Sequence, residues 1–320
     1  CSSIRTFAGE KLVPPRSDHE GFIPLMSLRD RLAILVLTYN EEVNLPACLA
    51  SLAGLQGILY VVDSGSTDQT QAIAKAAGAT VIEHPFEHYA AQRNWAQQQI
   101  PKGAEWVLHL DADERLTPAL VTELTALLRN PPPEIVGYML RKRTVFMGRW
   151  IKHGGHYPSY HLRLFRRDVG RCEDRLYDQH FLVDGPVRVL QHDYIDVVST
   201  NLNTWLFRHV RWAEMEATEL SARVLTEEGR VQPTFWGTPI ARRRWLRTDV
   251  YYRSPRYLRA FLYWFYRYVL RLGFLDGKEG LVFHFLQGLW FRLLVDIKLD
   301  EIEQSRLRAV SSDATVETHK

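Results

Sequence analysis

The segment Trp106–Glu114, W-V-L-H-L-D-A-D-E, decides the fold of this chain. A short apolar run ends in Asp111, and Asp113 follows two residues later. A buried strand that carries two carboxylates at its carboxyl end offers hard oxygen ligands, which suit Mg²⁺ or Mn²⁺ bound to a diphosphate. The D-x-D pair alone is weak evidence, because acidic residues also favour the first turn of a helix. Its meaning therefore depends on what surrounds it.

Strands and helices alternate on both sides of this segment. Continuous apolar runs predict strands buried on both faces, and amphipathic stretches with capping residues predict helices between them. The expected strands are 32–38, 58–62, 80–82, 106–110 and 136–142, and the expected helices are 43–52, 67–77, 89–99 and 118–128. This alternation predicts an α/β fold with a single Rossmann-like, mostly parallel sheet and flanking helices. Ligands of such sheets bind beyond the carboxyl ends of the strands.

Two more polar loops follow strands at that same edge. The first is T-Y-N-E-E at 38–42, and the second is V-D-S-G-S-T-D at 62–68. Asp63 ends a strand, and its carboxylate can accept a hydrogen bond from a uracil imide or a ribose hydroxyl. Asp68 is expected to cap the following helix or to complete the turn, and not to touch the ligand. Each loop alone could be an ordinary polar turn, but the three together predict a site for a nucleoside diphosphate.

Composition supports a sizeable core, since 46% of the 320 residues are hydrophobic and 24% are charged. Three cysteines form no C-x-x-C pair, which favours a reducing cytoplasm. We expect an irregular lead-in at 1–30, a catalytic domain at 31–202, a helical region at 203–305 and a flexible tail at 306–320. Within the catalytic domain, 31–143 would bind the nucleotide and 144–202 the acceptor.

The helical region is rich in arginine. Five arginines share one face of a predicted helix, and six apolar side chains take the opposite face. The arginines are Arg253, Arg256, Arg259, Arg267 and Arg271, and the apolar residues are Leu258, Phe261, Leu262, Phe265, Val269 and Leu272. This pattern favours contact between a cationic amphipathic helix and an anionic membrane surface. The alternative is a helical hairpin packed on the catalytic domain.

The three loops resemble the nucleotide-sugar motifs of the family 2 inverting glycosyltransferases, which have the GT-A fold. The segments A-A-Q-R-N-W-A at 90–96, R-L-F-R-R at 163–167 and G-F-L-D-G-K-E-G at 273–280 resemble, more narrowly, the bacterial lipopolysaccharide-core glucosyltransferase group. The resemblance covers about 31–300 and is strongest over 31–115.

The resemblance implies roles for individual residues. Asp63 would contact the nucleoside, Asp111 the ribose or diphosphate, and Asp113 an Mg²⁺ or Mn²⁺ ion, with Asp111 as a second metal ligand. Arg163 would neutralise the departing diphosphate, because a guanidinium group binds phosphate through two hydrogen bonds. The remaining expected nucleotide-sugar contacts are Thr38, Tyr39, Asn40, Glu41, Arg93 and Asn94.

The catalytic base is less clearly indicated. Inverting transfer needs a carboxylate that takes the proton of the acceptor hydroxyl. The segment C-E-D-R-L-Y-D-Q-H at 172–180 offers Glu173, Asp174 and Asp178. Members of the resembled group usually carry a His-Glu pair near this point, where this chain has Asp178 and Gln179. We favour Asp178, then Asp174, which fits the E-D pattern of the wider family, and then Glu173.

The sequence thus predicts metal-dependent transfer of a hexose from a nucleotide sugar, a UDP-sugar first, to a lipid-linked saccharide or lipid carrier in synthesis of lipopolysaccharide or a related envelope glycan. The enzyme would lie peripherally on the inner face of the plasma membrane. A polyprenyl-phosphate sugar synthase and a non-catalytic membrane-binding module are the alternatives. The first loop lacks the glycines of a nucleotidyltransferase or a nicotinamide dehydrogenase. No nucleic-acid partner is expected, because the arginine stripe is not a broad basic patch.

Overall fold

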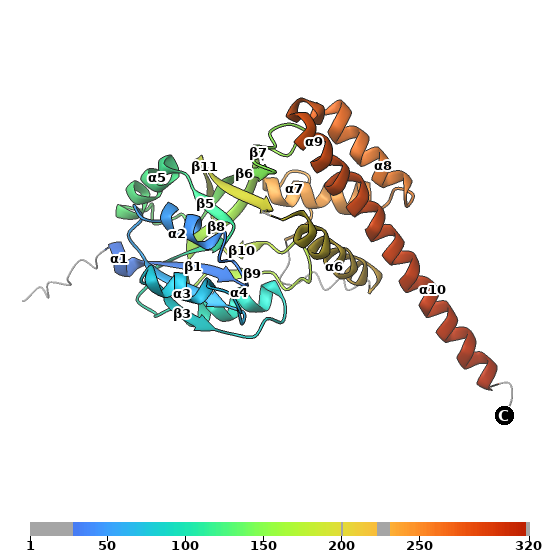
Figure 1. The fold of residues 1–320 in the computed structure, drawn as a ribbon, viewed down its shortest axis with the longest axis horizontal. Coiled ribbons are helices and arrows are strands. Elements are labelled where there is room, and N and C mark those ends of the chain that lie inside the picture. Colours follow the sequence, from blue (N-terminus) through green and yellow to red (C-terminus); the bar gives the residue numbers. More distant parts are fainter. Residues whose placement is uncertain (1–27, 200, 223–230, 318–320) are drawn as a thin grey trace, which may run out of the picture.

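The computed structural model describes residues 28–199, 201–222 and 231–317. The predicted lead-in up to residue 27 and the last three residues of the predicted tail therefore lie outside the described residues. The molecule has an α/β unit and, beside it, a unit of C-terminal helices (Figure 1). The last helix runs well past the rest of the molecule in this view.

The first half of the sheet is parallel, as the alternating pattern predicts. Its strands lie in the order β3-β2-β1-β4, and every neighbouring pair is parallel. These strands are β1 Leu32–Thr38, β2 Ile58–Asp63, β3 Thr80–Glu83 and β4 Trp106–Asp111. The flanking helices are α1 Leu28–Arg31, α2 Leu45–Ser51, α3 Thr70–Ala76, α4 Tyr89–Gln98 and α5 Pro118–Arg129. Helix α5 begins as its sequence predicts, since the Thr117 hydroxyl accepts a hydrogen bond from the Leu120 amide.

The second half of the sheet mixes directions. Strand β8 is antiparallel to both of its neighbours, β4 and β6, whereas β11 runs parallel to β6. Strand β5 completes the order at the far edge, and β7 pairs with β6. These strands are β5 Glu114–Leu116, β6 Gly137–Phe146, β7 Arg149–Trp150, β8 Ser159–Arg166 and β11 Val187–Ser199, while β9 Gly170–Cys172 and β10 Phe181–Val183 form a separate pair. The fold is the expected GT-A-like α/β arrangement.

Strand β1 lies in the middle of the core, and both of its faces are covered. Leu32, Ile34 and Val36 belong to one buried cluster, and Ala33 and Leu35 belong to another on the opposite face. Such burial explains why this strand is an unbroken apolar run in the sequence instead of an alternating one.

Strand register brings the three polar loops to one edge. Thr38 at the end of β1 pairs with Asp63 at the end of β2, and the neighbouring Leu37 pairs with Asp111 at the end of β4. Because parallel strands end on the same side of a sheet, the loops that follow them must meet there. This convergence confirms the central expectation from the sequence.

The described part of the C-terminal unit consists mainly of helices that follow β11 in the chain. The elements are α6 Leu202–Ser221, α7 Pro239–Trp245, η1 Leu246–Tyr251, α8 Leu258–Phe265, η2 Tyr266–Leu270, η3 Gly273–Asp276, α9 Gly277–Phe283, η4 His284–Trp290 and α10 Phe291–Glu317. Helix α10 packs along α6 through a buried cluster that includes Ala213, Ala217 and Phe291. The stretch predicted as a flexible tail continues α10 as far as Glu317.

Two arginines of the predicted stripe face inward, contrary to our expectation. Arg259 is 5% exposed and pairs with Asp296 of α10, and Arg267 is 6% exposed and donates to the Gly154 carbonyl. The rest of the stripe does not follow them, because Arg253 and Arg271 are exposed and Arg256 is partly exposed. Arg253 and Arg256 also precede α8, so the predicted single helix begins only at Leu258. Arg259 and Arg267 turn inward because a carboxylate and a carbonyl on other segments accept their hydrogen bonds.

Candidate active site

The first two loops at the sheet edge are joined by reciprocal hydrogen bonds. The Asn40 amide donates to the Ser66 hydroxyl at 2.8 Å, and the Thr67 amide donates to the Asn40 side-chain oxygen at 2.8 Å. Asn40 has a φ of 53°, a conformation that asparagine tolerates better than most residues. The pairing holds Tyr39 and Glu41 at the mouth of a pocket.

Asp63 organises the second loop from inside the protein. Its carboxylate is fully buried and accepts hydrogen bonds from the Ser66 amide, the Thr38 hydroxyl and the Gln71 amide group, at 2.8, 3.0 and 2.9 Å. These donors hold the pKa of the carboxyl below its ordinary value although burial opposes that shift. Asp63 does not line the pocket, so its predicted contact with the nucleoside rests on the family resemblance.

Asp68 lies one residue before Gln69, the N-cap of α3, and completes the turn there rather than capping the helix. It accepts a hydrogen bond from the Thr70 amide at 2.9 Å, near the start of α3, and another from the Glu42 amide at 3.2 Å. Its contacts therefore stabilise the junction of the two loops.

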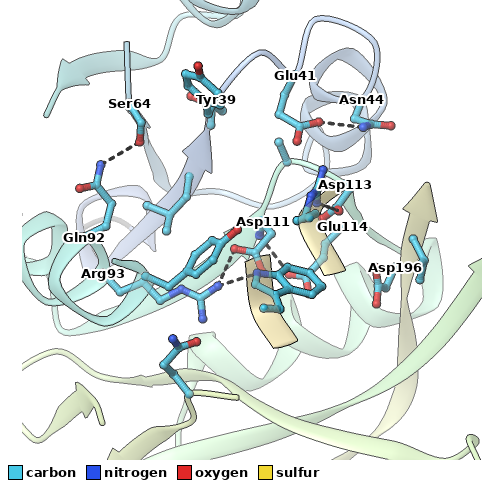
Figure 2. A pocket seen from close by; sticks show the side chains of 18 of the residues that line it. Tyr39, Glu41, Asn44, Ser64, Gln92, Arg93, Asp111, Asp113, Glu114 and Asp196 are labelled. Atoms are coloured by element: carbon cyan, nitrogen blue, oxygen red, sulfur yellow. Dashed lines mark hydrogen bonds and ion pairs between the residues drawn. The ribbon is translucent and has the colours of Figure 1, made fainter. Parts of the chain in front are cut away.

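Asp111 is held by two arginines from different elements. Arg93 of α4 donates to both carboxylate oxygens, at 2.6 and 2.9 Å (Figure 2). Arg163 of β8 donates to one of them at 2.9 Å. Arg163 also pairs with the buried Glu114. Burial would raise the pKa of Asp111, but the two guanidinium groups outweigh burial and lower it. Asp111 is therefore a compensated anion, and Arg93 and Arg163 are positioned beside it at the pocket.

Asp113 is in the opposite electrostatic situation. Burial raises the pKa of its carboxyl well above the ordinary value, and the carboxylates of Asp196, Asp111 and Glu114 raise it further. The Arg208 guanidinium is 4.0 Å from the Asp113 carboxylate. A group of acids with so little compensation creates a demand for a cation at Asp113.

The donor set at Asp113 suits a cation that also binds phosphate oxygens. No group of three or more histidine, cysteine or acidic side chains is arranged to hold a metal within the parts of the chain that the structure describes. Magnesium commonly uses one or two protein carboxylates, with substrate phosphates and water completing the octahedron. Asp113, with Asp111 nearby, fits that pattern and does not resemble a structural zinc site.

Asp111, Asp113, Arg93 and Arg163 line a single cavity of about 1290 Å³. Most of the predicted site residues line it, from both halves of the sheet. They are Thr38, Tyr39, Asn40, Glu41, Arg93, Asp111, Asp113, Arg163 and Asp178. Asn94 instead points to the neighbouring strand, where its side chain exchanges two hydrogen bonds with the Cys172 backbone.

The three candidate bases differ sharply in their surroundings. Asp178 lines the cavity, has a φ of 56°, and is held by an ion pair with Arg247. Asp174 lies on the surface with 90% of its side chain exposed, near His88. Glu173 is buried and forms two 2.7 Å hydrogen bonds with Arg244. Of the three, Asp178 alone is among the described residues that line the cavity.

The cavity also has a wall that the sequence did not reveal. Asp196 of β11 lies beside Asp113 and pairs with Lys142 of β6 at 2.8 Å. Helix α6 contributes Trp205 and Arg208. The ion pair between Asp196 and Lys142 joins two long strands and has no local sequence signature. The arginine excess after residue 206, in contrast, marks the segment from which Arg208 comes.

The comparisons with known proteins give this site its family. The Glycosyl transferase family 2 model matches residues 33–191, which contain all three loops and the three candidate bases. Residues 33–191 form a family 2 glycosyltransferase domain. The matched domain is thus that of a glycosyltransferase, and its fold is the GT-A-like arrangement expected from the motifs.

Individual relatives of this family 2 glycosyltransferase match over shorter stretches. The lipopolysaccharide core biosynthesis glycosyltransferase LpsC of Rhizobium meliloti is 35% identical over 147 residues, covering 44% of this chain and 53% of LpsC. An uncharacterized glycosyltransferase of Rickettsia conorii, RC0292, is 35% identical over 98 residues, covering 31% of this chain and 34% of its own. The chain therefore spans about half or less of the length of these relatives.

A solved structure resembles the chain more extensively but more distantly. The mannosyltransferase PcManGT of Pyrobaculum calidifontis, in complex with GDP-Man and Mn²⁺, aligns with 84% of this chain and 86% of its own. The identity is 16% and the TM-score is 0.47. A likeness this distant supports no statement about the site.

Proposed function

We propose that this glycosyltransferase moves a hexose, with inversion, from a UDP-sugar to a lipid-linked saccharide in the synthesis of lipopolysaccharide or a related envelope glycan. The observation that carries the proposal is the contrast between Asp111 and Asp113 at one end of the cavity. Asp111 is neutralised by two arginines, whereas Asp113 lies among other acids. LpsC, whose name places it in lipopolysaccharide core synthesis, supports the choice of acceptor.

Asp113 and Asp111 would hold Mg²⁺ or Mn²⁺ against the diphosphate of the donor. The bound ion would neutralise negative charge on that diphosphate. Arg163 and Arg93, which both contact Asp111, would assist the departure of the nucleoside diphosphate through charge-assisted hydrogen bonds. Thr38, Tyr39, Asn40 and Glu41 would then flank the nucleotide from the opposite loop.

Asp178 is our proposed base. In the reaction, the acceptor hydroxyl oxygen forms a bond to the anomeric carbon while the bond from that carbon to the diphosphate oxygen breaks. The hydroxyl proton passes to the Asp178 carboxylate, and the nucleoside diphosphate leaves with the bonding electron pair. The ion pair with Arg247 keeps Asp178 ionised and fixes its direction, because the guanidinium lowers the pKa of this carboxyl even though burial opposes the shift.

Donor binding can be tested directly by thermal shift. The full chain is mixed with UDP-glucose, UDP-galactose or GDP-mannose, with and without Mn²⁺, and the melting temperature is recorded. The true donor should stabilise the protein according to RT ln(1 + [L]/Kd), and more strongly with the ion. Asp113→Asn should lose the metal-dependent part, whereas Asp184→Asn, at an exposed surface position, should keep it. An unchanged Mn²⁺ effect in Asp113→Asn refutes the metal assignment.

The acceptor and the base are tested by turnover. Asp178→Asn should still bind donor but should lose transfer, and normal turnover in that variant would return the role to Asp174 or Glu173. Supplying polyprenyl phosphate in place of a lipid-linked saccharide separates the two acceptor classes. Product on the phosphate alone would identify a polyprenyl-phosphate sugar synthase. We also propose that the enzyme works on the inner face of the plasma membrane, where such acceptors are made accessible.

A further inference from the structure

The outward face of the helix that carries the arginines is almost entirely apolar. We call this surface the apolar crest, and its side chains are 36 to 62% exposed. The crest consists of Leu258, Phe261, Leu262, Phe265, Val269, Leu270, Leu272, Phe274 and Leu275, from α8 through η3. The packed partner helix adds Leu281 and Phe285, which are 47 and 46% exposed. A continuous run of large apolar groups on a surface marks a site of interaction.

A buried ion pair and a buried hydrogen bond to another segment fix the crest in this outward orientation. Arg259 donates to Asp296 at 3.0 Å, and both side chains are buried. One turn or more further on, Arg267 donates to the Gly154 carbonyl at 2.8 Å and to the Tyr263 hydroxyl at 2.9 Å. Rotating the helix so that the crest is buried would break the hydrogen bonds of Arg259 and Arg267 to other segments. It would also leave Asp296 buried without its cation.

Charge around the crest favours an anionic surface. Residues 257–290 contain only two acids, Asp276 and Glu279, and their side chains are 3 and 14% exposed. The cation Lys278 is 87% exposed, and Arg271 is also at the surface. Residues 257–290 thus offer the accessible cations Arg271 and Lys278 and little accessible negative charge. This combination lets cations bind anionic headgroups while apolar side chains enter the lipid.

The long helical stretch that follows α8 and η2 distinguishes binding at the membrane interface from crossing the membrane. Gly273–Arg308 is long and apolar enough to cross a membrane by length and composition, with a mean hydropathy of 1.3 and only 39% of its most apolar window buried. However, Arg292 and Asp296 in its middle form ion pairs with Glu216 and Arg259 inside the protein. Charged groups are costly at the centre of a bilayer, so a position at the interface is favoured over a crossing.

We propose that the apolar crest inserts into the surface of an anionic bilayer, with Arg259 and Arg267 turned inward toward the protein. This inference rests on the proposed function, since it supplies the surface from which a lipid-linked acceptor would be drawn. It differs from ordinary cationic amphipathic helices, in which the arginines themselves meet the headgroups.

Vesicle sedimentation tests the proposal. The full chain is mixed with vesicles of phosphatidylglycerol and phosphatidylethanolamine or of phosphatidylcholine alone, and bound protein is measured. We expect tighter binding to the anionic vesicles, and a loss of about tenfold or more in Phe261→Ser/Phe265→Ser. Leu307→Ser removes a more exposed apolar group, 71% exposed, outside the crest and should bind like the parent.

Two outcomes would decide against lipid binding by the crest. Equal vesicle binding by the crest variant and the parent overturns the proposal. Sedimentation velocity without lipid gives the second check, because a dimer that dissociates in the crest variant would show that a second copy of the chain covers this surface. Donor-induced thermal shifts, measured on the same variants, keep the two proposals apart. Vesicle binding without any donor effect would defeat the catalytic proposal alone.

Discussion

The buried pair Arg259–Asp296 allows a quantitative test of the inward arginine face. The two side chains are 5 and 1% exposed, and Asp296 accepts hydrogen bonds from the Arg259 guanidinium and from the Tyr257 amide at 2.8 Å. Arg259→Met removes the cation and leaves a buried carboxylate, which should lower the free energy of unfolding by about 3–5 kcal/mol. Such a change is large beside the typical total stability of a domain.

The double variant Arg259→Met/Asp296→Leu should recover most of that loss. Replacing both charges with apolar groups removes the cost of desolvating them, and the Tyr257 amide then lacks its acceptor, at a cost of about 1 kcal/mol. Arg253→Met is the matched control from the same stripe. Arg253 is 76% exposed and pairs with Asp249 four residues away, so its removal should change stability by no more than about 0.5 kcal/mol.

Urea denaturation followed by circular dichroism measures all of these values. We expect the free energy of unfolding of Arg259→Met to be well below that of the double variant, and that of the double variant to be close to the parent value. If Arg259→Met costs no more than Arg253→Met, the arginine is not buried against Asp296 in solution. In that case the crest need not face outward, and the orientation argument fails with it.

Two further predictions concern the segment of the candidate bases. Burial would raise the pKa of Glu173, but hydrogen bonds from His180 and Arg244 lower it to about 2 from 4.5. The ionised Glu173 carboxylate therefore stabilises the fold fully above pH 4.5, and this stabilisation is lost as the pH falls toward 2. Glu173→Gln should reduce the loss of unfolding free energy over that acid range by about 3 kcal/mol. An equally large loss in the variant would contradict this prediction. Arg247→Met removes the cation that lowers the pKa of Asp178 and should move the acid limb of kcat/KM to higher pH, with donor binding unchanged. An unmoved limb would mean that Asp178 is not the base.

The first half of the fold was predictable because its signals are local. Strand β1 is buried on both faces, so its sequence is an unbroken apolar run, and Thr117 with Pro118 marks the start of α5. Parallel strands that follow one another through helices must end at one edge, which is why Asp111 and Asp113 could be placed beside the first loop before any coordinates. Chemistry at the ends of adjacent strands needs no long-range information.

The second half was less predictable because its partners are distant in the chain. Strand β11 pairs with β6 and β5, and Asp196 reaches Asp113 only through that pairing. Asp63 shows the same limit on a smaller scale. Its position at a strand end suggested a ligand contact, whereas its hydrogen-bond partners, among them Thr38 and Gln71, occupy it within the protein. Periodicity and motifs identify a carboxylate but not the donors that will satisfy it.

The arginine stripe shows why an amphipathic pattern alone cannot assign the buried face. A helical repeat separates charged from apolar side chains, and water normally takes the charged side. Here the carboxylate that meets Arg259 lies 37 residues later in α10, and the carbonyl that meets Arg267 lies 113 residues earlier. Once these pairs form, the apolar face must point outward, and its stability then depends on a nonaqueous neighbour. The proposed lipid-linked acceptor would bring such a neighbour beside the crest.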